Sequence, residues 1–228
     1  MVIPGFSTSR VPMRIRLYIA ISITLSLTPL LLDTVEESLL KSGSSRITLL
    51  IVSEISKGLL IGLMGRMFML SIQFSASTIA MFIGMGAMPG TPIEGQEAVP
   101  ALVSLITVTA TALVFFTDLH LEIIYALLGS YDVSPVGQWP QMKMQLNDIV
   151  RNLSKAMFVS IQASAPFFIY AVLVNLAIGL ANKLTPQIPI YFISLPFVLL
   201  GGLMLLFIVS DEMLILFMQG FRDWLLNG

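Results

Sequence analysis

The chain of 228 residues is strongly apolar, because 56% of its residues are hydrophobic and 11% are charged, whereas a typical soluble domain has about 45–50% apolar and about 25% charged residues. This composition excludes an ordinary water-soluble domain and predicts an integral membrane protein. The formal net charge of -1, without a basic stripe, argues against a nucleic-acid partner, and the absence of cysteine excludes disulfides and thiolate metal centres.

The first residues form a basic lead-in to an apolar stretch. Arg14 and Arg16 precede the apolar run 17–32, which is slightly short for a membrane span of about 20 residues. No small-residue cleavage site follows this run, so the start of the chain does not resemble a secretory signal peptide. The next loop mixes acidic and basic residues, and the membrane topology therefore stays open.

The next apolar stretch, 47–70, is long enough to span a membrane but carries charges. Glu54, Lys57 and Arg66 would each cost a few kcal/mol at the centre of a lipid-facing helix. We therefore expect this helix to face protein or water. Glu54 and Lys57 lie three positions apart and share a helix face, where they can pair. Two interpretations stay open: a path for ions, or a structural ion pair buried against a partner subunit.

The same stretch contains a small-xxx-small pattern. Gly58 and Gly62 lie four positions apart, on one helix face. Such a pattern lets another helix backbone approach closely, so we expect it to pack against a helix.

A bulky apolar cluster ends the run 71–88. It consists of Met81, Phe82, Met85 and Met88, interleaved with Gly84 and Gly86 and followed by Pro89 and Gly90. Methionine side chains repack easily, while glycine and proline bend the backbone and stop the helix. One interpretation is a plug-like loop that closes a water-filled conduit as an apolar constriction. The other is a simple Gly/Pro turn at a helix end.

Catalytic motifs are absent from the sequence. The apolar run 98–116 ends at Asp118 and His120, but two residues at this spacing point apart on a helix and do not form an acid–base pair. No phosphate loop, zinc-binding helix or nucleophile elbow is found. We therefore expect no enzymatic activity, no metal site and no cofactor.

The polar stretch 135–152 is interpreted as a hinge loop between two halves of the chain. The apolar runs 156–181 and 188–210 follow it, interrupted by Pro166 and Pro196. The short connector between these runs predicts a helical hairpin. Its defining residues are Asn182, Lys183, Pro186 and Gln187.

This hairpin carries a family resemblance. It reads Asn-Leu-Ala-Ile-Gly-Leu at 175–180, Asn-Lys-Leu-Thr-Pro-Gln at 182–187 and Leu-Pro-Phe at 195–197. The segment resembles the FliR family of flagellar biosynthetic proteins, within the FliR/SctT export-gate subunits of type III secretion. Members show an Asn-Leu-Ala-Leu-Gly lead, a basic residue before Ala-Pro-Gln and a Pro-containing apolar helix; Thr185 replaces the usual alanine. The Val-Pro-basic entry at 11–16 matches as well, as does a central loop made by Asp118-Leu119-His120 with Ser130, Pro135 and Gly137.

The resemblance implies an all-α integral membrane helical bundle with long broken helices and helical hairpins, built into a helical multi-subunit export gate. It implies a FliP-like front half at 1–134, the hinge at 135–152 and a FliQ-like hairpin at 153–228. The implied function is a channel for unfolded flagellar subunits in the bacterial inner membrane, at the flagellar basal body. The implied partners are FliP and FliQ type subunits, FlhB and FlhA type export components, membrane lipid and the exported substrates.

Two alternatives and two departures accompany this interpretation. The homologous subunit of a virulence injectisome would have the same fold and a different cargo, and a small-solute transporter would need an inverted repeat that is not seen. The family has a further apolar helix before the Val-Pro stretch, and Met1 falls just after its expected end. The family loop that often reads Gly-x-Gln-Met-Gly is Phe-Ile-Gly-Met-Gly at 82–86 and lacks the glutamine.

Overall fold

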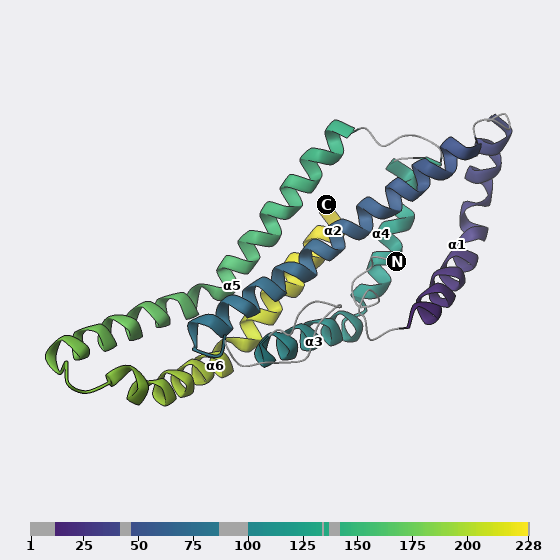
Figure 1. The fold of residues 1–228 in the computed structure, drawn as a ribbon. Helices are drawn as coiled ribbons and strands as arrows, with labels where there is room; N and C mark the ends of the chain where they lie inside the picture. The colour runs from purple at the N-terminus through teal and green to yellow at the C-terminus, as the bar shows by residue number, and fades with distance from the viewer. Residues whose placement is uncertain (1–11, 42–46, 87–99, 134, 137–141, 228) are drawn as a thin grey trace. The chain divides into compact units, whose positions relative to one another are not determined.

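The computed structural model describes residues 12–41, 47–86, 100–133, 135–136 and 142–227. The regular elements of these ranges are α-helices (Figure 1): α1 Met13–Lys41, α2 Ile47–Phe82, α3 Ala101–Phe116, α4 Leu119–Val133, α5 Met142–Leu184 and α6 Ile190–Asn227. The predicted all-α fold is confirmed.

Four of these helices, α1, α2, α5 and α6, are long and apolar enough to cross a membrane. The helices α3 and α4 are bent by 68° at a short break, and they add a fifth span if the bent pair is one. The chain is therefore a multi-pass membrane protein with a broken helix, as predicted. The break is at Asp118, whose φ of 56° lies in the left-handed region and whose carbonyl accepts the first backbone bond of α4 from Leu121 at 2.9 Å.

The helices are longer and more continuous than the apolar runs indicated. Pro166 lies inside α5 and Pro196 inside α6, so neither proline ends its helix. Membrane helices tolerate internal proline because neighbouring groups and local adjustments satisfy the freed backbone carbonyl. The stretch 135–152, interpreted as a hinge loop, is helical from Met142 onward.

The chain divides into two compact units, and α2, α3, α5 and α6 each contribute to both. The first unit contains Met1–Phe68, Val114–Ser154 and Arg222–Gly228, and the second contains Met69–Leu113 and Lys155–Phe221. These units do not follow the order of the sequence, because α2, α3, α5 and α6 each have residues in both.

The second unit has a continuous apolar core. Ala76, Ile79 and Ala80 on α2 and Ile83 just after it are fully buried. They pack in one cluster with residues of α3, α5 and α6, namely Leu102, Val103, Ile106, Ala110, Ala163, Phe167, Met213 and Phe217. Small and large side chains alternate in this set, which allows close helix packing.

The first unit is held by mixed contacts. The rings of Phe68 on α2 and Trp224 on α6 have centroids 5.4 Å apart, and both side chains are buried. The Asn152 amide donates to the Met64 sulfur at 3.5 Å, which joins α5 to α2.

Candidate functional site

The predicted charge pair of α2 is formed. The Lys57 ammonium nitrogen lies 3.0 Å from a carboxylate oxygen of Glu54. The Lys57 side chain is 10% exposed and that of Glu54 is 23% exposed, so the pair is largely withdrawn from solvent. A buried ammonium group needs further acceptors, because it carries three N–H donors.

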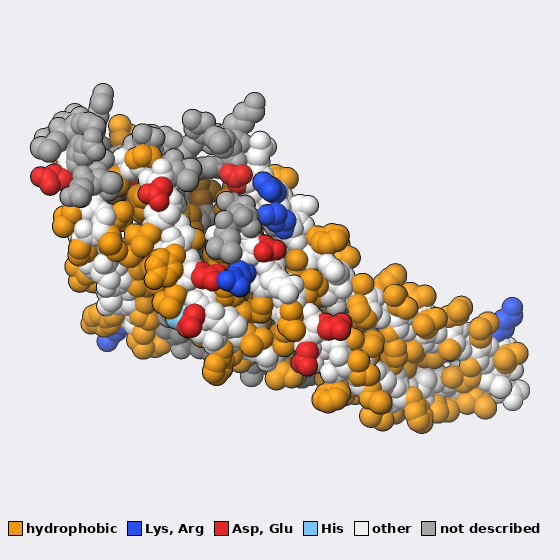
Figure 2. Space-filling view, turned by 180° about the vertical axis from the view of Figure 1, so that it is seen from behind, with side chains coloured by type: hydrophobic (Ala, Val, Ile, Leu, Met, Phe, Trp, Pro, Cys, Tyr) orange, Lys and Arg blue, Asp and Glu red, His pale blue; other side chains and the backbone are white. Residues whose placement is uncertain are grey.

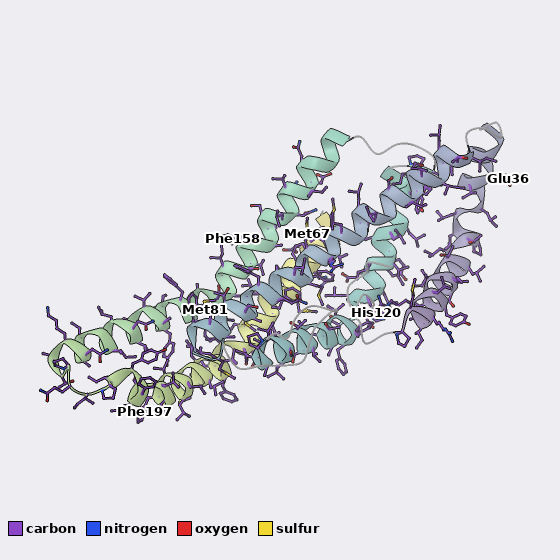
Figure 3. All side chains as sticks on the ribbon, in the orientation of Figure 1. Glu36, Met67, Met81, His120, Phe158 and Phe197 are labelled. Atoms are coloured by element: carbon purple, nitrogen blue, oxygen red, sulfur yellow. The ribbon has the colours of Figure 1, made fainter. Side chains whose placement is uncertain are left out.

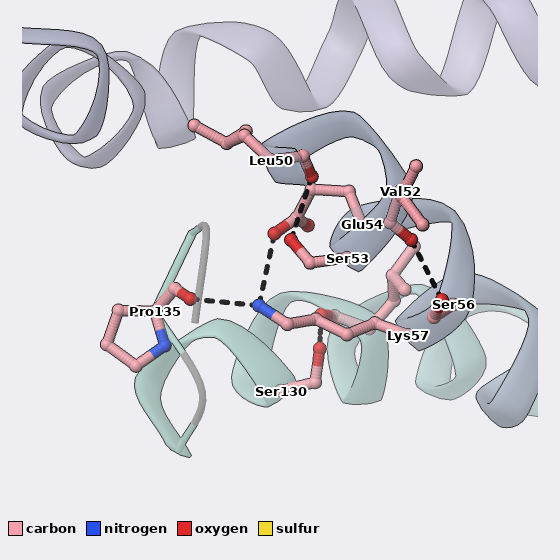
Figure 4. A network of polar contacts seen from close by, with 9 residues as sticks. Leu50, Val52, Ser53, Glu54, Ser56, Lys57, Ser130 and Pro135 are labelled. Atoms are coloured by element: carbon pink, nitrogen blue, oxygen red, sulfur yellow. Dashed lines mark hydrogen bonds and ion pairs between the residues drawn. The ribbon is translucent and has the colours of Figure 1, made fainter. Parts of the chain in front are cut away.

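The additional partners of Lys57 come from the end of α4. Lys57 donates a second hydrogen bond, of 2.8 Å, to the backbone carbonyl of Pro135 (Figure 4). Its nitrogen also lies 5.9 Å from the centroid of the Tyr131 ring. The cation thus sits at the C-terminal end of α4, where the helix dipole favours positive charge. The pair therefore fixes the segment after α4 to α2.

The other residues predicted on α2, namely Gly58, Gly62 and Arg66, differ in their burial. A Cβ added at Gly58 would meet nothing within 4 Å, and Gly58 is exposed. Gly62 is buried, and Arg66 is half-buried with partners of its own. Among the described residues, no other helix therefore approaches Gly58 closely.

The predicted gate segment begins with an ordered helix end. Helix α2 ends at Phe82, and Gly84 adopts a left-handed φ of 83°. The Gly84 N–H donates to the Met81 carbonyl at 3.2 Å, and the Met85 N–H donates to the Ala80 carbonyl at 2.8 Å. This pair of bonds is the Schellman arrangement that closes a helix at a glycine. Met88, Pro89 and Gly90 lie outside the described residues.

The bulky side chains of this segment point in different directions. Met81 is 70% exposed (Figure 3), whereas Phe82 and Met85 pack against the core of the second unit. The Phe82 ring lies 5.7 Å from that of Phe168 on α5. Ile83 is fully buried, and the sequence interpretation did not single it out. Among the described residues of this segment, Met81 is thus exposed, whereas Phe82, Ile83 and Met85 anchor the segment to the core.

The predicted hairpin connector is fully exposed. Asn182, Lys183, Pro186 and Gln187 are all accessible, and α5 and α6 run side by side into it (Figure 1). The last helical bond of α5 runs from the Thr185 N–H to the Ala181 carbonyl at 3.0 Å, and a turn bond from the Ile188 N–H to the Thr185 carbonyl at 3.2 Å follows. The predicted hairpin is present, and its tip is exposed.

A buried serine seam, absent from the sequence interpretation, joins α2 to α5. The Ser160 hydroxyl donates to the Ser71 carbonyl at 2.9 Å, and the Ser75 hydroxyl donates to the Ser160 carbonyl at 3.1 Å. All three serines are at most 5% exposed. The signal was present, because small residues recur every four positions on both helices, at 71 and 75 and at 156, 160 and 164.

Among the described residues, the buried atoms His120 Nδ1, Glu122 Oε2 and Asn152 Oδ1 of the first unit find no hydrogen-bond partner. The other oxygen of Glu122 lies 3.6 Å from Arg222 Nε, and His120 stacks near Phe115 at 5.1 Å between ring centroids. No cluster of three or more metal-ligating side chains occurs in the part of the chain that the structure describes.

Comparison with known proteins gives one consistent result. A family model described as "Bacterial export proteins, family 1" matches residues 1–224. The chain is 26% identical to the flagellar biosynthetic protein FliR of Caulobacter vibrioides over 225 residues, covering 99% of this chain and 89% of that protein. The Escherichia coli protein of the same name is 23% identical, with 89% and 76% covered. The Aquifex aeolicus protein of that name is 21% identical, with 97% and 84% covered.

Proposed function

The chain belongs to the bacterial export proteins, family 1, and from this membership we propose that it is a subunit of the flagellar type III protein export gate. In this proposal it assembles with FliP and FliQ type subunits in the inner membrane. The assembly forms the channel through which unfolded flagellar subunits pass. The chain itself is a non-enzymatic transport component. In this proposal, FlhA and FlhB type export components act beside it.

The observation that carries the assembly is the exposed apolar surface of the α5–α6 hairpin. Between residues 168 and 208 only Ala171 and Gly202 are buried. Large apolar side chains are exposed along both helices, among them Phe168, Leu173, Leu180, Phe192, Phe197 and Phe207. Figure 2 shows hydrophobic side chains spread over one face of the molecule. A helix that is apolar all round must be covered by protein or by lipid.

Charge supports the same conclusion. Lys183, at the hairpin tip, is the only charged residue between 156 and 210. The stretch 190–210 contains 21 residues, which corresponds to about 31 Å of helix at about 1.5 Å per residue, close to the hydrocarbon thickness of about 30 Å. The hairpin therefore suits an environment of lipid and neighbouring hairpins. In this proposal it belongs to a FliQ-like half at 153–228, beside a FliP-like half at 1–134.

For the gate itself, we assign closure of the channel to the segment that begins at Met81. Met81 offers exposed apolar bulk immediately before the Schellman end of α2, and the segment continues through Met85, Met88 and Pro89. Narrow apolar constrictions exclude water, and moving them aside re-wets the path. The polar link at 135–152, whose start is held by Lys57, then joins the two halves of the subunit.

The glycines and the remaining charge of α2 serve assembly in this proposal. Gly58 leaves an open backbone face for a neighbouring helix, and the Glu54–Lys57 pair with Arg66 removes charge from the lipid-facing side. The connector residues Asn182 and Gln187 stay accessible for contact with other gate components.

The flagellar branch is chosen because each relative reported above carries the name of a flagellar biosynthetic protein. The test is complementation of a strain that lacks its own flagellar family member. Restored flagellar export and motility, without secretion of injectisome cargo in the matching injectisome-deficient strain, is the expected result. Rescue of the injectisome strain alone would move the chain to the virulence branch.

A further inference from the structure

The second unit contains a hollow between α5 and α6, beside Pro166. Its volume is about 230 Å³, and all of its lining residues belong to this unit. The α5 side is formed by Gln162, Ala163 and Pro166, and the α6 side by residues 209, 212, 213 and 216. Because these four positions are three or four residues apart, they lie on one face of α6. The charged residue of this face is Glu212, which thus lies opposite the proline of α5.

The polar groups of the hollow supply several oxygen acceptors. Pro166 has no N–H, so the carbonyl of Gln162 lacks the donor that a helix normally provides four positions later. The Gln162 side chain adds an amide oxygen, and Glu212 adds the two oxygens of its carboxylate. The rest of the lining is apolar, namely Ala163, Val209, Met213 and Leu216. Beside such walls the effective dielectric constant is lower than in water, so the carboxylate attracts a positive charge more strongly.

The described part of the second unit holds no cation against this carboxylate. Glu212 is exposed, and among the described residues it takes part in no hydrogen bond or ion pair. The described basic residues of this unit are Lys155 and Lys183. They lie 7 and 21 positions from Gln162 along α5, which corresponds to about 10 Å and about 31 Å of helix. A cation for Glu212 therefore has to come from outside the described part of the unit.

We propose that this hollow is a docking site for one basic side chain, a lysine or an arginine, from a neighbouring subunit of the export gate. The inference rests on the proposed function, which places other subunits around the α5–α6 hairpin. An ammonium group carries three N–H donors and a guanidinium group carries five, and both suit several oxygen acceptors around one point. Glu212 supplies the charge, and the free carbonyl of Gln162 accepts a further hydrogen bond.

Size and ligand number favour a side chain over other occupants. Pockets for small-molecule ligands measure about 300–1,000 Å³, which is more than the 230 Å³ of this hollow. A calcium ion takes about six to eight oxygen ligands, more than Gln162 and Glu212 together provide. The end of one long basic side chain needs fewer acceptors and fills a smaller space.

The first test compares Glu212→Gln with Asp211→Asn in the complete complex with its FliP and FliQ type partners. Both changes remove one negative charge with little change in size. Asp211 is the matched control, because it is also exposed and does not line the hollow, and adjacent positions do not share a helix face. Loss of one partner of a desolvated charge pair speeds dissociation, so the Glu212→Gln complex should lose its partners in mild detergent about tenfold faster than wild type. The Asp211→Asn complex should dissociate at the wild-type rate.

The second test identifies the occupant. A photo-reactive benzoylphenylalanine replaces Ile208, which is 68% exposed and lies one helical turn before Glu212 without lining the hollow. Irradiation of the assembled complex and peptide mapping by mass spectrometry should find a cross-link to a partner segment that carries a lysine or an arginine. Replacing that basic residue by glutamate together with Glu212→Lys should restore the wild-type dissociation rate, whereas either replacement alone should raise it.

Each outcome decides the inference. Equal dissociation rates of the Glu212→Gln and Asp211→Asn complexes overturn it, and so does a cross-link found only on lipid or on partner segments without a basic residue. If Glu212→Gln prevents assembly, the charge exchange should restore assembly, and failure of the exchange also overturns the inference. The proposed function is tested separately by the wild-type chain, since a wild-type chain that retains neither partner removes the proposed function itself.

Discussion

The ammonium group of Lys57 on α2 donates a 2.8 Å hydrogen bond to the carbonyl of Pro135, 78 positions later in the chain. The same group is paired with Glu54 at 3.0 Å. One buried cation thus satisfies a carboxylate and the backbone beyond α4 together. Replacing Lys57 removes the hydrogen bonds to the Glu54 carboxylate and to the Pro135 carbonyl.

Lys57→Met should therefore destabilise the chain substantially. Removing one partner of a fully buried ion pair costs about 3–5 kcal/mol, and the 23% exposure of Glu54 places the expected loss toward or below the lower end. The measurement is unfolding of the purified complex in detergent. Arg151→Met, at an exposed position of α5, is the control and should change little.

The coupling between the two charges has its own test. Since the charge of Glu54 becomes unpaired only when Lys57 is lost, Glu54→Gln combined with Lys57→Met should cost less than the sum of the single changes. Free energies of unfolding of the four variants complete the cycle. Additive losses would show that the two side chains are neighbours without being partners.

Ser75→Leu should separate α2 from α5. The Ser75 side chain is 1% exposed and touches the Ser160 backbone, so there is no room for a larger group. Overpacking of this kind costs about 1–3 kcal/mol, whereas Ser75→Ala, which only removes hydrogen bonds, should cost about 0.6 kcal/mol. Helicity followed through an SDS titration measures both. Ser154→Leu on the exposed side of α5 is the control, and an equal loss there would contradict the seam.

Gly84→Ala should weaken the end of α2. A non-glycine residue in the left-handed region costs roughly 1–2 kcal/mol, and Gly84 has a φ of 83°. Gly84→Asn should cost less, because asparagine tolerates this region better. Thermal unfolding of the two variants gives the order, and an alanine variant as stable as wild type would show that Gly84 is not held in this conformation.

Deletion of residues 86–90 should leave the complex assembled but leaky. The deletion keeps Gly84 and Met85, which close α2, and removes Met88, Pro89 and Gly90 from the segment that is proposed to close the channel. Loss of an apolar constriction re-wets the path. Single-channel conductance in planar bilayers, with co-purification of partners as the check on assembly, measures the effect. An assembled variant as tight as wild type would reduce the segment to a turn.

Much of the fold follows from local features of the sequence. Long apolar runs with few charged residues predicted the membrane spans. The hairpin around Lys183 was predicted from its Asn, Pro and Gln residues. The same hairpin carried the family resemblance, which the match over residues 1–224 confirms. Local composition is sufficient here, because a span is defined by its length and its lack of charge.

Residue-level contacts between helices were harder to predict. The spacing of Glu54 and Lys57 indicated their pairing, but nothing local indicated that Pro135 is the second acceptor. The burial of Ile83 could not be predicted from its neighbours in the sequence, since Ile83 packs against a glycine of α6 that lies far away in the chain. The extent of α5 was also misjudged, because polar residues at its start occupy a helix rather than a loop.

The central claim, that this chain is a gate subunit, is tested most directly by purification of the tagged chain after co-expression with FliP and FliQ type subunits, followed by native mass spectrometry. The account predicts a discrete complex that contains one copy of this chain with several copies of its partners. A stable, monodisperse monomer that retains neither partner in mild detergent would contradict it.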